Sequence, residues 1–242
     1  MKVGIITQAR MTSTRLPGKV MLTAAGRPLL DFHLDRLLAT ALPVIVATTT
    51  NASDEPIVSL ARARDVAVFR GSENDVLSRF AGAAAEAGLD VVVRVTSDCP
   101  LLDPAVITEA VRRFVQIDDP DAHVSNVLDR TYPRGLDVEV FSAAALAEAQ
   151  REATEPADRE HVTPYLYANR TGRATLHAIT RSPDASRYRV TLDTADDLTV
   201  IRALIEEHDA ASLDADALIA VLDQHPELVA VNADVEQKKL GE

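Results

Sequence analysis

Residues 91–96 read VVVRVT, a run of β-branched residues that contains a single arginine. Such a run is typical of a central strand that is buried on both faces of a parallel sheet. The preceding residues 74–87 predict an alanine-rich helix, which Gly88 ends. The following residues 104–115 predict a further helix. A buried strand between two helices is the repeating unit of an α/β fold.

The same alternation extends back to the start of the chain. Apolar spacing predicts strands at 3–6, 44–48 and 66–69 and helices at 29–38 and 53–64. The sequence therefore predicts an α/β three-layer sandwich, in which a mostly parallel, Rossmann-like sheet lies between two layers of helices.

The alternation breaks at about 126–180, so we expect a single domain, 1–242, with a small insertion there. Residues 124–135 are polar and predict an irregular segment, and the alternation in 136–141 predicts a strand with one buried face. Thr194 and Asp197 form a predicted capping box at the start of a helix. The other predicted elements are helices at 143–153, 158–169 and 214–222, strands at 175–179 and 189–192, and a frayed tail at 237–242.

Composition narrows the class of protein. The formal net charge is −12, and an acidic surface repels nucleic acids and anionic membranes, so we expect neither as a partner. The single cysteine, Cys99, excludes an internal disulfide and a cysteine-based zinc site. No apolar run is long enough to span a bilayer, and the first residues are too short an apolar segment for a signal peptide. These features predict a cytoplasmic protein.

A basic loop follows the first predicted strand. Residues 8–19 read QARMTSTRLPGK and carry Arg10, Arg15 and Lys19 with no acidic residue between them. Ligands of open α/β sheets bind beyond the carboxyl ends of the strands, and three cations there suit a triphosphate better than they suit a solvated surface loop. The loop matches neither G-x-x-x-x-G-K nor G-x-G-x-x-G, so a P-loop and a dinucleotide site are not expected.

Two aspartates are candidates for a metal site. Asp98 lies just beyond the strand 91–96, and Asp193 precedes the predicted cap Thr194. Mg²⁺ takes oxygen ligands, usually one or two carboxylates together with phosphate oxygens. The alternatives are an Asx-turn before Pro100 for Asp98 and a helix N-terminal charge for Asp193.

Several stretches of the chain resemble the motifs of the cytidylyltransferases that activate acidic sugars. This family includes CMP-Kdo synthetase, acylneuraminate cytidylyltransferase and, with the strongest resemblance, the SpsF-type spore coat polysaccharide proteins. The resemblance lies in QARMTSTRLPGKV (8–20), RGSENDVLSRF (70–80), RVTSDCPLLDP (94–104), YPRGLDVEVFS (132–142), DREHVTPYLY (158–167) and VTLDTADDL (190–198). It implies a nucleotidyltransferase (GT-A-like) sheet, CTP as substrate, Mg²⁺ as cofactor and a homodimer formed through the segment around 126–180.

The resemblance also assigns site residues. Catalytic roles are expected for Arg10, Arg15, Lys19 and Asp98, and Mg²⁺ is expected on Asp98 and Asp193. The expected nucleotide-binding residues are Gln8, Ala9, Arg10, Ser13, Arg15, Lys19, Arg70, Gly71, Ser72 and Asp98. The expected acceptor-binding residues are Asn126, Arg134, Asp137 and His161. Arg130, Arg134 and Arg159 would suit an anionic acceptor, although the acceptor motifs of CMP-Kdo and acylneuraminate synthetases are not found here.

The expected reaction is attack of an acceptor hydroxyl on the α-phosphorus of CTP, with pyrophosphate as the leaving group. Three other functions stay open. A sugar-phosphate nucleotidyltransferase would be expected to carry a G-x-G-T-R loop, and a nucleotide-sugar glycosyltransferase a D-x-D motif, which Ser97-Asp98-Cys99 does not supply. A nucleotide-binding scaffold protein of polysaccharide assembly would not need Asp98 and Asp193 together with three cations.

Overall fold

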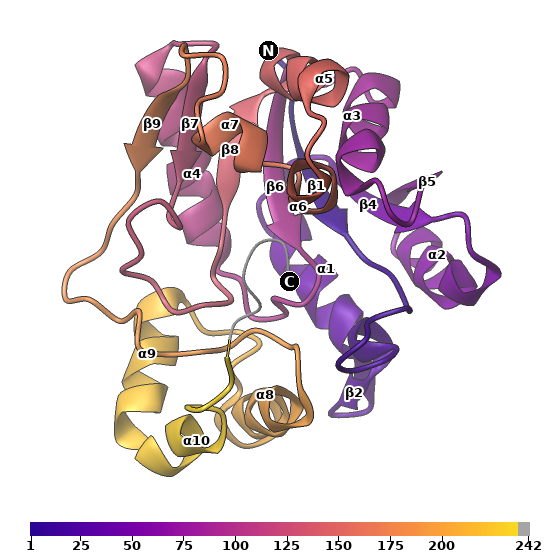
Figure 1. The fold of residues 1–242 in the computed structure, drawn as a ribbon. Coiled ribbons are helices and arrows are strands. Elements are labelled where there is room, and N and C mark those ends of the chain that lie inside the picture. The colour runs from indigo at the N-terminus through magenta and orange to yellow at the C-terminus, as the bar shows by residue number, and fades with distance from the viewer. Residues whose placement is uncertain (237–242) are drawn as a thin grey trace.

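The computed structural model describes residues 1–236, so the predicted frayed tail 237–242 lies outside the described residues. Its main sheet has seven strands in the order β5-β4-β1-β6-β8-β7-β9 (Figure 1). The strands are β1 (Val3–Gln8), β4 (Val44–Thr49), β5 (Ala67–Gly71), β6 (Val91–Thr96), β7 (Ala122–Ser125), β8 (Glu139–Ser142) and β9 (Thr175–Ala178). Only β8 runs antiparallel to its neighbours in this sheet. A separate antiparallel pair joins β2 (Thr23–Ala24) to β3 (Arg27–Pro28).

Helices cover both faces of this sheet, so the predicted α/β three-layer sandwich is confirmed. One face packs on α1 (Leu29–Leu38), α2 (Glu55–Ala63) and α4 (Pro104–Ile117). The helices α8 (Ala195–His208) and α9 (Ala215–Gln224) lie below the sheet in Figure 1 and belong to the same core cluster. The other face packs on α3 (Val76–Glu86), α5 (Ala143–Glu152) and α7 (Pro164–Tyr167). The remaining helices are α6 (Pro156–His161), α10 (Pro226–Val231) and the 3-10 turns η1 (Lys19–Met21) and η2 (Ala52–Asp54).

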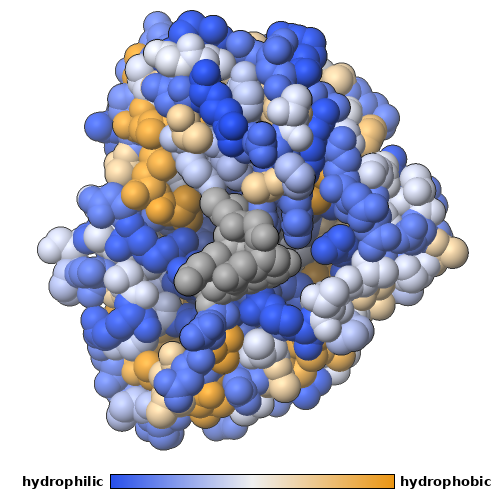
Figure 2. Space-filling view, in the orientation of Figure 1, coloured by the Kyte–Doolittle hydropathy of each residue, from blue (hydrophilic) through white to orange (hydrophobic). Residues whose placement is uncertain are grey.

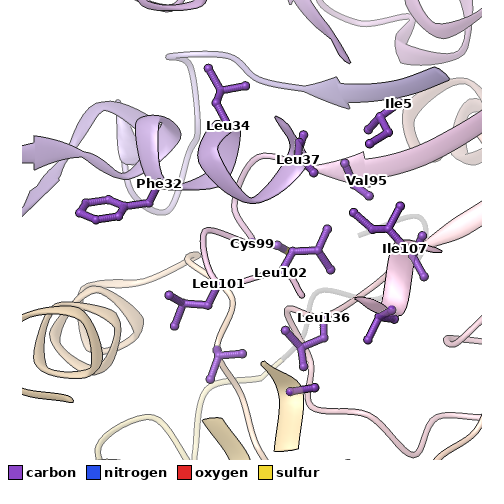
Figure 3. Close-up of a cluster of buried hydrophobic side chains, with 14 of the residues drawn as sticks. Ile5, Phe32, Leu34, Leu37, Val95, Cys99, Leu101, Leu102, Ile107 and Leu136 are labelled. Atoms are coloured by element: carbon purple, nitrogen blue, oxygen red, sulfur yellow. The ribbon is translucent and has the colours of Figure 1, made fainter. Parts of the chain in front are cut away.

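The larger core cluster lies on the α1 side of the sheet. Figure 3 shows part of this cluster, in which Ile5 of β1 and Val95 of β6 meet Leu37 of α1 and Ile107 of α4. Burial of β-branched residues on both faces of the strands explains why the VVVRVT run forms the centre of the sheet.

The main differences from the predicted elements fall after residue 117. Residues 122–125 form β7, so the prediction of an irregular segment at 124–135 was wrong for Val124 and Ser125. The prediction of one buried face for 136–141 was wrong, because Val140 and Phe141 of β8 enter the two core clusters on opposite faces. The predicted strand at 189–192 was also wrong: its single ladder contact is an isolated bridge between Arg134 and Arg189.

The predicted helix 158–169 is divided into α6 and α7 at Val162, whose φ of 71° is incompatible with a continuing helix. The capping box of Thr194 and Asp197 is confirmed at the start of α8. The segment 126–180, for which we expected an insertion, contributes β8 and β9 to the main sheet.

The face in Figure 2 is mainly hydrophilic, with scattered hydrophobic patches, as expected for a chain with a net charge of −12. Among the helices formed by residues 1–236, none has the length and apolar character that a membrane crossing requires.

Candidate active site

A cavity of about 230 Å³ that is open to solvent lies beyond the carboxyl ends of β1 and β6. Because these strands are parallel neighbours, with Gln8 opposite Thr96, the basic loop and the Asp98 loop leave the sheet at the same edge. The lining residues are Gln8, Ala9, Arg10, Ser13, Thr14, Arg15, Lys19, Val20, Val76, Arg79, Thr96, Asp98, Glu160, His161 and Asp193.

Lys19 joins the two aspartates that the sequence analysis names as candidate metal ligands. Its Nζ lies 2.8 Å from Oδ2 of Asp98 and 2.8 Å from Oδ1 of Asp193. Burial acts to raise the pKa of the Asp98 carboxyl, but the charge of Lys19 and its hydrogen bond outweigh burial and lower that pKa to about 2. Burial acts against the charge of Lys19, yet the two carboxylates raise the pKa of its ammonium. Asp98 and Lys19 are therefore both charged at neutral pH.

Each cation of the basic loop has a carboxylate partner from a distant part of the chain. Arg15 Nη2 lies 3.1 Å from Asp193 Oδ1, and Arg10 Nη1 lies 3.9 Å from Glu73 Oε1. The lack of an acidic residue within the loop therefore did not mean a lack of counter-charges. These contacts hold the cations around the cavity.

Backbone contacts bring the loops of Asp98 and Asp193 together. The carbonyl of Asp98 accepts hydrogen bonds from the amide of Leu192 at 2.8 Å and the hydroxyl of Thr191 at 3.2 Å. Buried Asp197 accepts from the amides of Asp193 and Thr194 and from Arg189. The capping box of α8 therefore also fixes the approach of Asp193 to the cavity.

A buried hydrogen-bonded chain supports the Asp98 loop from beneath. His33 of α1 lies 2.9 Å from the carbonyl of Cys99 through Nδ1 and 2.9 Å from Thr7 Oγ1 through Nε2. Since a carbonyl only accepts, Nδ1 carries the proton and Nε2 accepts from Thr7, whose hydroxyl in turn lies 2.8 Å from Ser97 Oγ. Burial lowers the pKa of His33 to about 4, so its ring is neutral at pH 7.

Asp54 is a support for the basic loop that the sequence did not reveal. Its fully buried carboxylate accepts from the amide of Met11 at 2.9 Å and from the hydroxyls of Thr48 and Thr49. Burial tends to raise the pKa of Asp54, but these donors outweigh burial and lower it. A buried anion thus ties the loop to the end of β4 and the start of α2.

The residues expected beside the nucleobase lie outside the cavity lining. Arg70 is held by the carbonyls of Thr49 and Asn51 and by Glu55. The carbonyl of Ser72 accepts from Arg79 at 2.9 Å, and a Cβ on Gly71 would lie 2.9 Å from Arg79 Cγ. Arg79, one turn into α3, lines the cavity instead. The signal for Arg79 was present in the motif RGSENDVLSRF, of which it is the tenth residue.

The expected acceptor residues take three different positions. His161 lines the cavity, next to Glu160. Asn126 is fully buried and uses its amide to hold the backbone of Leu136 and Val138, so the structure does not bring it to the cavity.

Asp137 and Arg134 occupy a second group of charges. Asp137 forms a two-point ion pair with Arg130, at 2.6 and 3.1 Å. Arg134 lies nearby, and among residues 1–236 its guanidinium has no hydrogen bond or ion pair. Burial, and then the charge of Arg130, lower the pKa of Arg134.

The donor set of Asp98 and Asp193 fits a hard divalent cation. Two carboxylates that already share one ammonium can supply the one or two protein ligands that Mg²⁺ usually takes. Within residues 1–236 no group of three or more His, Cys, Asp or Glu side chains could hold a metal ion. A metal ion at these two aspartates would therefore need oxygens from water and substrate for its other positions.

Comparison with known proteins identifies the class. A family model described as cytidylyltransferase matches residues 4–225. The spore coat polysaccharide biosynthesis protein SpsF of Bacillus subtilis is 31% identical over 239 residues, which cover 92% of this chain and 94% of that protein. A cytidylyltransferase structure from Leptospira borgpetersenii is similar with 33% identity and a TM-score of 0.90, over 99% of this chain and 100% of that one.

A structure of CMP:2-keto-3-deoxy-manno-octonic acid synthetase complexed with CTP is similar in fold, with a TM-score of 0.62, 18% identity and coverage of 86% of this chain and 100% of that one. The fold is that of an α/β nucleotidyltransferase. With the family match over most of its length, the chain belongs to the cytidylyltransferase family.

Proposed function

We propose that this chain transfers CMP from CTP to a hydroxyl of a small anionic acceptor, such as an acidic sugar, and releases pyrophosphate. The observation that carries this proposal is the convergence of Arg15, Lys19, Asp98 and Asp193 in one cavity. Two carboxylates beside two cations suit a triphosphate that arrives with a divalent cation, and a transfer of this kind needs mainly positioning and charge stabilisation.

The basic loop would bind the phosphates. Arg10, Arg15 and Lys19 line one cavity, and guanidinium forks and an ammonium match phosphate oxygens. As the bond to the α-phosphorus breaks, negative charge grows on the pyrophosphate, so fixed cations stabilise the transition state more than the ground state. Asp54, through the amide of Met11, keeps the loop in place before the substrate arrives.

Asp98 and Asp193 would hold Mg²⁺, which when bound supplies Lewis-acid charge stabilisation at the phosphate oxygens. The chain itself keeps Asp98 ionised, because Lys19 lowers the pKa of this carboxyl against the effect of burial. Arg189 lies 3.0 Å from Asp193 Oδ2 and holds that carboxylate in place. The hydrogen bonds that the carbonyl of Asp98 accepts from the amide of Leu192 and the hydroxyl of Thr191 hold the loops of the two aspartates together.

The acceptor site would lie around Arg134. A half-buried guanidinium with no partner among residues 1–236 is costly unless an anion joins it. The Arg130–Asp137 pair next to it is internally neutralised, so Arg134 is the cation left to bind a carboxylate or phosphonate. SpsF, to which this chain is similar over most of its length, is described as a protein of spore coat polysaccharide biosynthesis, which agrees with a sugar-like acceptor.

We also propose a homodimer formed through the segment around 126–180. This segment supplies β9, an edge strand whose Leu176 is 44% exposed. An exposed apolar residue on an unpaired strand edge favours pairing with another chain. Light scattering at micromolar concentration should give about twice the chain mass of 26.1 kDa, and a mass near 26.1 kDa would contradict the dimer.

Pyrophosphate release from a panel of nucleotides tests the reaction. In the presence of Mg²⁺ and a set of sugar acids, we expect pyrophosphate release from CTP and from no other nucleotide of the panel. Release only with a sugar phosphate would indicate a sugar-phosphate nucleotidyltransferase, and turnover of a nucleotide sugar would indicate a glycosyltransferase. Binding without any release would favour a nucleotide-binding scaffold.

A further inference from the structure

We infer that Asn232 is a positioning residue for Asp193, which it reaches through Asp197, and that the C-terminal segment 226–236 therefore takes part in the active site. The inference rests on the proposed function, in which Asp193 holds Mg²⁺. Asn232 directly follows α10 and lies beyond the stretch 4–225 that matches the family model. Its side chain is 3% exposed and reaches back to groups that precede it by 35 and 43 positions.

Two acceptors fix the orientation of the Asn232 amide. Its Nδ2 lies 2.9 Å from Oδ1 of Asp197 and 3.2 Å from the carbonyl oxygen of Arg189. An ionised carboxylate and a carbonyl only accept, so the nitrogen of the amide, and not its oxygen, must face them. One side chain thus donates both to the carboxylate of Asp197 and to the backbone of Arg189.

Asp197 and Arg189 pass this constraint on to Asp193. Asp197 is fully buried, and its Oδ2 accepts from the amides of Asp193 at 2.9 Å and of Thr194 at 3.0 Å. Its Oδ1 accepts from Nε of Arg189 at 2.7 Å, and Nη2 of the same guanidinium lies 3.0 Å from Oδ2 of Asp193. A shift of Asp197 or Arg189 would therefore move both the backbone and the carboxylate of Asp193.

The packing of α10 does not by itself explain an amide at position 232. Leu228 and Val229 of this helix pack against the larger core cluster, and Figure 1 shows α10 beside α8. These apolar contacts would hold the helix with an apolar residue at 232 as well. A buried amide is costly unless it is hydrogen-bonded, so the carboxylate and the carbonyl that it meets explain its presence better.

The same segment meets the site at a second point. The carbonyl oxygen of Glu236 lies 3.4 Å from Nη1 of Arg15, whose Nη2 lies 3.1 Å from Oδ1 of Asp193. Arg15 lines the cavity, so the chain has reached the cavity by residue 236. The segment thus approaches Asp193 through Asp197 and again through Arg15.

Hydrogen exchange of the amides of Asp193 and Thr194, followed by NMR in the metal-free protein, tests the positioning role directly. Asn232→Leu keeps the bulk of the side chain and removes the donor. It should speed the exchange of these two amides about tenfold, because the buried carboxylate that accepts from them loses a donor of its own. Asn232→Gln keeps an amide and should retain part of the protection.

The proposed reaction provides a second readout. Partners that orient metal ligands typically contribute about 10–100-fold to metal affinity or activity. Asn232→Leu should raise the Mg²⁺ concentration that gives half of the maximal rate about tenfold. The KM for CTP at saturating Mg²⁺ should stay nearly unchanged, because Asn232 lines neither the basic loop nor the cavity.

Leu228→Ala is the matched control, because it loosens the packing of α10 but leaves the hydrogen bonds of Asn232 in place. Urea unfolding should show a loss of stability in both variants, whereas only Asn232→Leu should change the exchange at Asp193 and the Mg²⁺ requirement. Equal changes in the two variants, or unchanged exchange at Asp193 in Asn232→Leu, would overturn the inference.

Asn232→Ser also removes the amide and takes the place of Asn232→Leu if that variant does not fold, with a shift in exchange expected in the same direction. Unchanged exchange in Asn232→Ser would then overturn the inference. A wild-type protein that does not turn over CTP would instead refute the proposed function, whereas exchange at Asp193 would still decide the role of Asn232.

Discussion

Nζ of Lys19 lies 2.8 Å from Oδ1 of Asp193, although the two residues are 174 positions apart in the chain. Asp98 Oδ2 lies 2.8 Å from the same ammonium. One lysine therefore contacts two carboxylates that are far apart in the sequence. Two carboxylates that share one ammonium repel each other, and a cation between them or beside them offsets this repulsion. This relationship is the structural basis of the metal site we propose.

Removal of either carboxylate should therefore abolish metal-dependent turnover. We expect Asp98→Asn and Asp193→Asn each to lower the rate about 100-fold or more, because metal-assisted charge stabilisation is worth several kcal/mol. Pyrophosphate release measures the rate, and circular dichroism should show an unchanged fold. Asp196→Asn is the control, since Asp196 is exposed in the first turn of α8. Full turnover of the wild-type enzyme in excess EDTA would rule out the metal.

The cations of the basic loop should act on the leaving group. Arg15→Ala removes a guanidinium that lies 3.1 Å from Asp193 Oδ1, and Lys19→Ala removes the shared ammonium. Each should lower kcat/KM for CTP about 100-fold or more, by analogy with the loss of one donor to a developing oxyanion. Steady-state kinetics with CTP varied would measure this. Wild-type kcat/KM in both variants would mean that the loop is not the phosphate site.

The buried His33 predicts a pH dependence of stability. Its pKa is lowered to about 4 in the folded chain, from 6.5 when exposed, so the unfolded chain binds more protons between these values. The contribution of His33 to stability is therefore present above pH 6.5 and is lost as the pH falls toward 4. At about 1.4 kcal/mol per pKa unit, the loss is about 3 kcal/mol.

Urea unfolding of the wild type and of His33→Gln at pH 7, 5.5 and 4 would measure this loss. Carboxylates also titrate in the lower part of that range. The difference in unfolding free energy between the wild type and His33→Gln therefore isolates the effect of His33. It should narrow as the pH falls. A difference that stays constant from pH 7 to pH 4 would contradict a neutral, buried ring.

We expect Arg134 to contribute to binding of the acceptor and not to binding of the nucleotide. Its guanidinium has no partner among residues 1–236, and a charge-assisted hydrogen bond to an anion is worth about 1.5–3 kcal/mol. Arg134→Ala should therefore raise the acceptor KM about tenfold to a hundredfold and leave the KM for CTP nearly unchanged. Arg134→Lys should restore part of the loss. Kinetics with both substrates varied decides this, and either an unchanged acceptor KM or a preference for a neutral acceptor would refute the anionic site.

The fold could be predicted from the sequence where local signals and tertiary packing agree. The helix Leu29–Leu38 and the strand Val91–Thr96 were predicted with the observed limits, because apolar spacing and β-branching match their buried faces. The segment 189–192 looks like a strand but lies outside the sheet, where the carbonyls of Arg134 and Asp98 accept from its amides at Val190 and Leu192. Such long-range partners leave no periodic signal.

The candidate site could likewise be predicted only in part from the sequence. The motifs predicted that Asp98 and Asp193 would lie near the basic loop, but not that Lys19 would bridge them. Arg70 was expected at the cavity, whereas it is held by the ends of β4 and α2. Arg79 was missed because a basic residue in an amphipathic helix is usually assigned to the solvent face, and its burial depends on Gly71 in another element.

The most direct test of the central claim is mass analysis of the product. The protein is incubated with CTP, Mg²⁺ and a library of small acids that carry hydroxyl groups, and the mixture is searched for an acceptor whose mass has increased by one CMP. We predict one such CMP conjugate, formed in step with pyrophosphate and absent for Asp98→Asn. A product that carries UMP or AMP instead, or a conjugate formed equally well by Asp98→Asn, would contradict the account.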